Sequence, residues 1–264
     1  MNESPRSQAQ RDYLNRQLRH QRKIRAARFM LIILFLALWE LSASFGWLDS
    51  FIFSSPSRII LCLIQMTGDG SLFLHTGITL LETLVSFLAV VIIGLATALL
   101  LWFWRSLAEI LEPFLVMLNS LPKSALAPLL IVWLGNNMNT IIVAAVSVAL
   151  FGSILTLYTG FTSLDQDQIK LIYSLGGTRR DVLFKVLLPG SLPMIISNMK
   201  VNIGLCLVGV IIGEFLSSKA GLGYLITYGS QTFAMTMVVT SIVVLCLLSV
   251  ILYQAIAVLE KRLK

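Results

Sequence analysis

The sequence predicts an all-α membrane protein with six transmembrane helices. Of its 264 residues, 57% are hydrophobic and only 12% are charged, and the mean hydropathy is +0.86. Soluble domains, in contrast, carry roughly 25% charged residues. Apolar runs of about 18 or more residues recur along the chain, and each is long enough to cross the hydrocarbon core of a bilayer. The composition therefore predicts one helical domain embedded in a membrane.

Six apolar segments are the predicted spans, and a basic tail of residues 1–28 precedes the first of them. A less hydrophobic connection at 49–75 separates the first two spans, and a polar interruption at 163–193 separates the fourth from the fifth. The membrane domain accordingly extends over residues 29–264. The six predicted spans are residues 29–48, 77–104, 109–134, 139–162, 194–216 and 233–259.

Lysine and arginine are distributed unevenly between the connecting segments, which predicts the orientation. With the N-terminus inside, sixteen of them fall on inner segments, eight in the tail alone, and only Arg58 and Lys219 fall on outer ones. Because cytoplasmic loops carry the excess of positive residues, both termini and the polar interruption are predicted to be cytoplasmic. The tail is either an anchor of this kind or a helix on anionic lipid or against a cytoplasmic partner. It lacks the interleaved aromatic residues typical of nucleic-acid binding.

The motifs of common enzymes and metal sites are missing from the sequence. It contains no phosphate-binding loop of the form G-x-x-x-x-G-K-[ST], no H-E-x-x-H and no G-x-S-x-G. Neither His20 nor His75 has a second histidine or cysteine at metal-ligand spacing. We therefore expect no catalytic centre, metal or cofactor in this chain.

The polar interruption contains the segment "SLGGTRRDVLFKVLLPGSLP" at 174–193, which predicts a short amphipathic helix between Gly177 and Pro189. Two adjacent glycines allow a sharp turn before it, Pro189 is expected to end it, and Pro193 suits the first turn of the fifth span. The helix is either a rigid lever moved by another protein or one that lies on lipid. Its apolar side is formed by Val182, Leu183, Val186 and Leu187.

The third span carries prolines and polar residues, which predicts a broken helix that lines a pathway. Pro122 and Pro128 free backbone carbonyl groups that protein or water must satisfy. Lys123 offers a positive charge to an anionic solute. The alternative is a kinked helix that serves packing alone. The polar residues of this segment are Asn119, Ser120, Lys123 and Ser124.

Charged residues inside the other spans predict contacts within the protein or a water-filled path. Glu40 and Lys200 lie near span ends, where long side chains reach the interface. Glu82 lies within the second span, and Glu214 near the outer end of the fifth serves either a gate or pathway or a structural pairing.

A small-residue pattern in the fifth span predicts close helix packing. It consists of Gly209, Gly213 and Ser217. The partner helix belongs either to the same chain or to a second copy.

Several motifs together resemble the permease subunits of ABC importers. The cytoplasmic signature of that family is E-A-A, three residues, Gly, nine residues and I-x-L-P. Here Gly176 matches the glycine and "VLLP" at 186–189 matches the ending, whereas "KLI" at 170–172 stands in place of E-A-A. The segments "FSSPSRI", "NSLPKSALAPLLIVWLG" and "GEFLSSKAGLGYLI" are similar to the branch that imports sulfonates, taurine, nitrate and related solutes.

The resemblance implies a type I ABC importer permease fold with both termini cytoplasmic, in a bacterial cytoplasmic membrane. It implies a homodimer with two ATPase subunits and an extracytoplasmic solute-binding protein. ATP and magnesium would then be bound by the ATPase, and this chain would be no enzyme. The solute is a sulfonate, taurine, nitrate or similar. Alternatives are a vitamin precursor such as a thiamine pyrimidine, or an ATP-independent transporter, which has no reason to carry the cytoplasmic signature.

The resemblance also implies roles for particular residues. The outer loop contains Gly221 and Gly223, which contact the binding protein or close an outer gate, and the implied pathway adds Glu214 to the polar residues of the third span. The implied ATPase-coupling residues are Gly176, Gly177, Thr178, Arg179, Arg180, Asp181, Phe184, Lys185 and Pro189.

Overall fold

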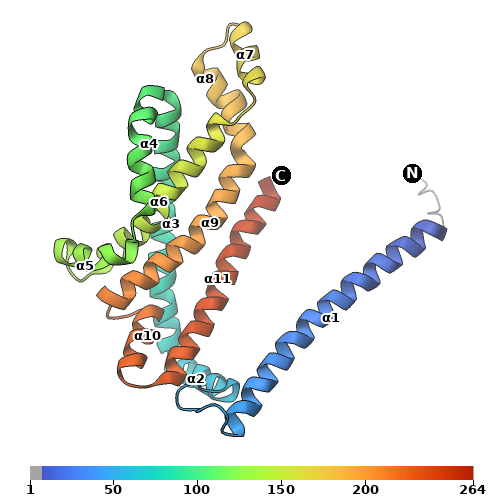
Figure 1. The fold of residues 1–264 in the computed structure, drawn as a ribbon, viewed down its shortest axis with the longest axis vertical. Coiled ribbons are helices and arrows are strands. Elements are labelled where there is room, and N and C mark those ends of the chain that lie inside the picture. Colours follow the sequence, from blue (N-terminus) through green and yellow to red (C-terminus); the bar gives the residue numbers. More distant parts are fainter. Residues whose placement is uncertain (1–7, 264) are drawn as a thin grey trace.

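A computed structural model describes residues 8–263, and every regular element in that range is helical (Figure 1). Five helices are long and apolar enough to cross a membrane, and a sixth span results if one bent helix pair is counted as a unit. The predicted all-helical membrane fold is therefore confirmed, with five or six candidate spans. The cytoplasmic placement of the termini stays a prediction.

The first helix stands apart from the rest of the molecule. α1 (Gln8–Ser44) approaches the other elements only where it meets α2 (Pro56–Gly68) (Figure 1). Glu40 makes the connection, since its carboxylate accepts hydrogen bonds from the Ser57 amide at 3.0 Å and the Ser57 hydroxyl at 2.8 Å. Glu40 thus satisfies a backbone amide in the first turn of α2 that has no partner within that helix. The sequence predicted only a connection at 49–75 and did not predict α2.

Four long helices form the body of the molecule. α3 (Ser71–Phe103), α6 (Met138–Thr162), α9 (Leu188–Ser217) and α11 (Met235–Leu263) pack along one another, and α10 (Leu222–Gln231) lies between α9 and α11 (Figure 1). The largest buried cluster lies between these helices. Its members include Phe87, Val90, Ala149, Cys206, Leu222 and Leu248.

The segment predicted as one kinked span at 109–134 is broken into two helices. α4 (Arg105–Ser120) and α5 (Lys123–Leu134) meet at an angle of 95°. The break occurs at Leu121 and Pro122, both in extended conformation, because proline removes a backbone donor and cannot continue the helix from Leu121.

The prediction that Pro189 ends the cytoplasmic helix is wrong. α8 (Arg179–Val182), a π-helical turn (Leu183–Leu187) and α9 run on as one helix of 39 residues, Arg179–Ser217. In the π turn the amide of Leu188 donates to Leu183, five residues back. The widened turn leaves space for the ring of Pro189. The π turn has already changed the regular hydrogen-bond pattern at this point of the helix, so the backbone amide that proline lacks is not missed there.

The small residues of α9 face α6 of the same chain. A Cβ atom on Gly209 would lie 2.5 Å from the Cα of Ala145, and one on Gly213 would lie 3.0 Å from the Cα of Ile141. The Ser217 hydroxyl donates to the side chain of Asn136 at 3.1 Å. Of the two locations left open by the sequence, the contact within the chain is the one observed.

Candidate functional site

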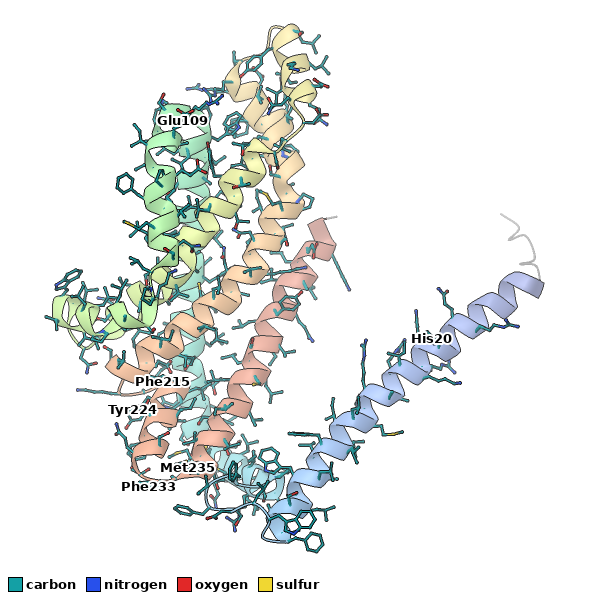
Figure 2. All side chains as sticks on the ribbon, in the orientation of Figure 1. His20, Glu109, Phe215, Tyr224, Phe233 and Met235 are labelled. Carbon is teal, nitrogen blue, oxygen red and sulfur yellow. The ribbon has the colours of Figure 1, made fainter. Side chains whose placement is uncertain are left out.

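The predicted coupling segment forms a hairpin at one end of the molecule. α7 (Gln166–Ser174) and α8 project beyond the bundle at the top of Figure 1, opposite α2 and α10. Figure 2 shows Glu109 of α4 near the same end, with Phe233 and Met235 at the other. Gly176 turns the chain between the two short helices with a φ of +77°, a conformation that glycine adopts without strain.

Local contacts fix the start of α8. The Thr178 hydroxyl accepts from the Asp181 amide, and the Asp181 carboxylate accepts from the Thr178 amide at 2.8 Å, which forms a capping box. Lys185 then forms an ion pair with Asp181 at 2.8 Å. Three of the predicted coupling residues therefore hold the helix in shape.

Arg179 binds the end of another helix within the chain. Its guanidinium donates to the carbonyl oxygen of Trp102 at 2.7 Å and lies 5.2 Å from the centre of the Trp102 ring and 5.7 Å from that of Phe103. Trp102 belongs to the last turn of α3, where carbonyl groups lack helical partners. Arg179 therefore joins α8 to α3, although it is exposed, as is its neighbour Arg180.

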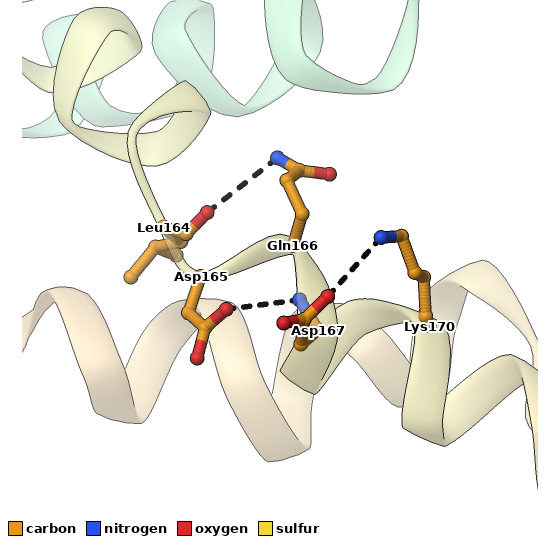
Figure 3. A network of polar contacts seen from close by, with 5 residues as sticks. All are labelled: Leu164, Asp165, Gln166, Asp167 and Lys170. Carbon is orange, nitrogen blue, oxygen red and sulfur yellow. Dashed lines mark hydrogen bonds and ion pairs between the residues drawn. The ribbon is translucent and has the colours of Figure 1, made fainter.

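Residues in the position of the E-A-A motif belong to α7, whose first turn is fixed by two acidic residues (Figure 3). Asp165 accepts from the Asp167 amide at 2.9 Å and so caps the helix. Asp167 forms an ion pair with Lys170 at 3.1 Å. Lys170 thus stabilises α7 locally.

The hairpin presents apolar side chains outward. Phe184 is 66% exposed and Leu175 is 76% exposed, and Leu171 and Tyr173 of α7 are exposed as well. On the opposite side, Val182 is buried, and Leu183 and Leu187 are buried against α3 and α6. The sequence predicted Phe184 as a coupling residue but missed Leu171 and Tyr173 of α7 and Leu175, which follows it, because no helix was expected there.

The predicted pathway residues of the third span gather at the break between α4 and α5. The Lys123 ammonium group donates to the carbonyl oxygen of Asn119, and the Asn119 side chain covers Gly152 of α6. The Ser120 hydroxyl donates to the carbonyl of Met117 at 2.8 Å. Asn119, Ser120, Pro122 and Ser124 are exposed, and Lys123 is half-buried.

Glu214 lies inside the protein with the predicted outer-loop glycines. Its carboxylate accepts from the Thr79 hydroxyl at 2.6 Å and from the Gly223 amide, and the Gly221 amide donates to His75 at 3.0 Å. At 1% exposure the side chain cannot touch a solute in this conformation, which favours the structural pairing. The sequence missed Thr79 and His75, which lie more than a hundred positions away.

Reversing the charge of Arg179 is expected to loosen the hairpin from the bundle in the isolated protein. Arg179→Glu removes an exposed hydrogen bond and a cation–π contact of a charged group, worth about 1 kcal/mol, and places a carboxylate beside the Trp102 carbonyl. We expect a lower unfolding temperature and faster proteolysis of residues 163–178. Arg180→Glu is the matched control and should change stability by less than about 0.5 kcal/mol. Equal effects of the two reversals would contradict the role of Arg179.

Comparison with known proteins identifies the family. A family model described as "Binding-protein-dependent transport system inner membrane component" matches residues 90–264. A probable ABC transporter permease of Haemophilus influenzae is 32% identical over 88% of this chain and 94% of its own. The formylaminopyrimidine transport permease ThiX of Halalkalibacterium halodurans is 25% identical over 89% and 93%, and the taurine transport permease TauC of Escherichia coli is 24% identical over 86% and 85%.

Solved structures give the same fold. A chain of the MetNI methionine ABC transporter in an inward-facing conformation superposes with a TM-score of 0.63 and 21% identity, over 71% of this chain and 93% of that one. The matched family and the six-span fold together account for the bundle, the broken third span and the absence of an ATPase motif. The chain therefore belongs to the inner-membrane components of binding-protein-dependent transport systems and is the non-enzymatic, multi-pass permease subunit of an ABC importer, which works with a separate ATPase and a solute-binding protein.

Proposed function

We propose that two copies of this chain assemble with two ATPase subunits and move a small solute inward from an external binding protein. ATP and magnesium are bound by the ATPase in this proposal, since this sequence has no phosphate-binding loop. ATP and the loaded binding protein favour different conformations of the permease, and transport follows from that difference.

The observation that carries the proposal is the apolar surface of the α7–α8 hairpin. Phe184, Leu175, Leu171 and Tyr173 are exposed on a projecting segment rich in charged residues. Exposed apolar groups rimmed by polar ones mark a protein-binding surface. Because α8 continues into α9, an ATPase that binds Phe184 acts directly on a membrane-spanning helix.

The single chain leaves apolar surface uncovered, which a second copy would share with the surrounding lipid. None of the most apolar window of α1 is buried inside the protein, and Val132 and Trp133 of α5 are exposed. We infer that the break between α4 and α5 faces the second copy. The exposed polar groups at Asn119, Ser120 and Ser124 then line the pathway beside Lys123.

The ammonium group of Lys123 favours a solute with an anionic sulfonate group, such as an alkyl sulfonate or taurine, and taurine is the solute that the name of TauC gives. The name of ThiX supports a second candidate, a formylaminopyrimidine. Uptake of each labelled compound into proteoliposomes that contain the permease, the ATPase and the binding protein distinguishes the two. Uptake that persists without the ATPase would contradict the proposed mechanism.

Replacing Phe184 by alanine is expected to release the ATPase subunit. A buried aromatic anchor contributes at least about 2 kcal/mol to a protein interface, so co-purification of the ATPase should fall at least about 30-fold. Phe51 provides the matched control, since it is 60% exposed at the opposite end of the molecule, and Phe51→Ala should leave co-purification unchanged. Unchanged binding with Phe184→Ala would remove the hairpin from the interface.

A further inference from the structure

Two carboxyl groups meet inside the protein. Glu82 of α3 is 2% exposed and Glu214 of α9 is 1% exposed. Thr79 lies three residues before Glu82 on the same face of α3, and its hydroxyl donates to the Glu214 carboxylate at 2.6 Å, which brings the two carboxyl groups side by side. Two bare carboxylates at this distance repel strongly in a medium of low dielectric constant.

The two groups differ in their other partners. Glu214 accepts from the Thr79 hydroxyl at 2.6 Å and from the amide of Gly223. The Oε2 atom of Glu82 is buried and has no hydrogen-bond partner among the described residues. The groups around Glu214 are hydrogen-bond donors, which suit an ionised carboxylate. Glu82, in contrast, faces the Glu214 carboxylate, an acceptor, and no donor contacts its Oε2 atom.

No cation is placed to neutralise the pair within the described helices that surround it. The charged or titratable groups of α3, α6, α9 and α10, apart from the pair, are His75, Lys200, Cys206 and three tyrosines, Tyr158, Tyr224 and Tyr228. His75 accepts the Gly221 amide through Nδ1 and stacks on Tyr224. Lys200 is bound to Glu260, roughly 20 Å along α9 from Glu214 at 1.5 Å per residue. Lys219, on the adjacent turn, is exposed.

We propose that Glu82 and Glu214 hold one proton between them, with the Glu82 carboxyl donating to the Glu214 carboxylate, and that this pair fastens the outer turn to α3 and α9. The proton supplies the donor that the Glu82 carboxylate lacks and converts two facing acceptors into a donor and an acceptor. The carboxyl pair is also in direct contact with the outer turn at Gly221. A Cβ atom on Gly221 would lie 2.3 Å from Glu214 Oε1, so the backbone packs directly on the carboxylate.

The shared proton makes the outer turn sensitive to pH. The folded protein holds a proton that the unfolded chain releases at neutral pH, so the stabilisation is complete at low pH and is lost as the pH rises through the titration of the pair. Loss of the proton leaves two facing charges between α3 and α9, which separates these helices at their outer ends. This inference does not depend on the identity of the solute or on the ATPase contact.

Infrared spectroscopy and thermal unfolding of the full-length permease in detergent test the proposal. We expect the wild-type protein to show the C=O band of a protonated carboxyl at neutral pH, and Glu82→Gln to remove that band. The glutamine amide still donates to Glu214, so Glu82→Gln should keep the wild-type unfolding temperature and abolish the loss of stability at alkaline pH. Glu214→Gln should lower the unfolding temperature, because its amide group faces the donors of Thr79 and Gly223.

Glu260→Gln is the control, since Glu260 is the acidic partner of an ion pair with Lys200, and it should keep both the band and the alkaline transition. Absence of a protonated carboxyl band from the wild-type spectrum would overturn the proposal. So would a Glu82→Gln protein that fails to fold, or one that keeps the alkaline loss of stability.

Discussion

Replacing Gly209 by leucine is expected to abolish the folded permease. A Cβ at this position already lies 2.5 Å from the Cα of Ala145 and 3.2 Å from its carbonyl oxygen, so even Gly209→Ala forces α9 away from α6. Overpacking in a rigid core costs about 1–3 kcal/mol and more where backbone must move. Backbone must move here, and we expect Gly209→Ala to lower the unfolding temperature and Gly209→Leu to yield aggregated protein on size-exclusion chromatography.

The same helix supplies the control for this experiment. Gly204 also lies in α9, and a Cβ there meets nothing within 4 Å. Gly204→Ala should therefore be neutral or stabilising, by at most about 1 kcal/mol, since alanine is the better helix former. A Gly209→Ala protein as stable as Gly204→Ala would show that α6 and α9 separate easily at this point.

Replacing Gly221 by alanine is expected to detach the outer turn. Gly221 has a φ of +115°, which disfavours any residue with a Cβ, and the added methyl group would lie within 2.3–2.6 Å of all three carboxyl atoms of Glu214. The amides of Leu222 and Gly223, which donate to Thr79 and Glu214, should lose their protection in hydrogen exchange. We expect faster exchange over residues 221–224 and a lower unfolding temperature.

A control variant at Gly46 separates the effect of backbone strain from the effect of the contact between Gly221 and Glu214. Gly46 also has a positive φ, +73°, but a Cβ there meets nothing within 4 Å. Gly46→Ala should cost only the strain of a left-handed residue, about 1–2 kcal/mol, with exchange at 221–224 unchanged. If both variants behave alike, the Glu214 contact contributes nothing to the turn.

The sequence predicted the long helices well because their signal is local. Hydropathy marks a span within about 20 residues, and α6 (Met138–Thr162) lies almost where the fourth span was placed. The short helices were missed for the same reason, since α2 and α7 are too short or too polar to resemble spans. Pro189 misled the prediction because a π turn, which admits the proline, depends on backbone geometry that the residue types do not specify.

Long-range pairings were beyond sequence reasoning. The role of Arg179 at an ATPase stays a prediction. Its contact with Trp102, 77 positions away, was missed because a basic residue beside glycines gives no sign of that contact. Glu214 and Glu82 were each noted as costly charges in a membrane. Their contact depends on how α3 and α9 pack, which the hydrophobic pattern of either helix leaves open.

Residues Arg179–Ser217 form one continuous helix, whose whole length is about 58 Å at 1.5 Å per residue. Phe184 and Glu214 both belong to this helix. A displacement of either end of this helix therefore moves the other end. If the ATPase binds Phe184, as we propose, a binding protein that shifts the outer turn changes the tilt of the helix that the ATPase contacts, and thermodynamic reciprocity then requires each partner to alter the affinity for the other. In that case the arrival of solute outside reaches the ATPase through this one helix.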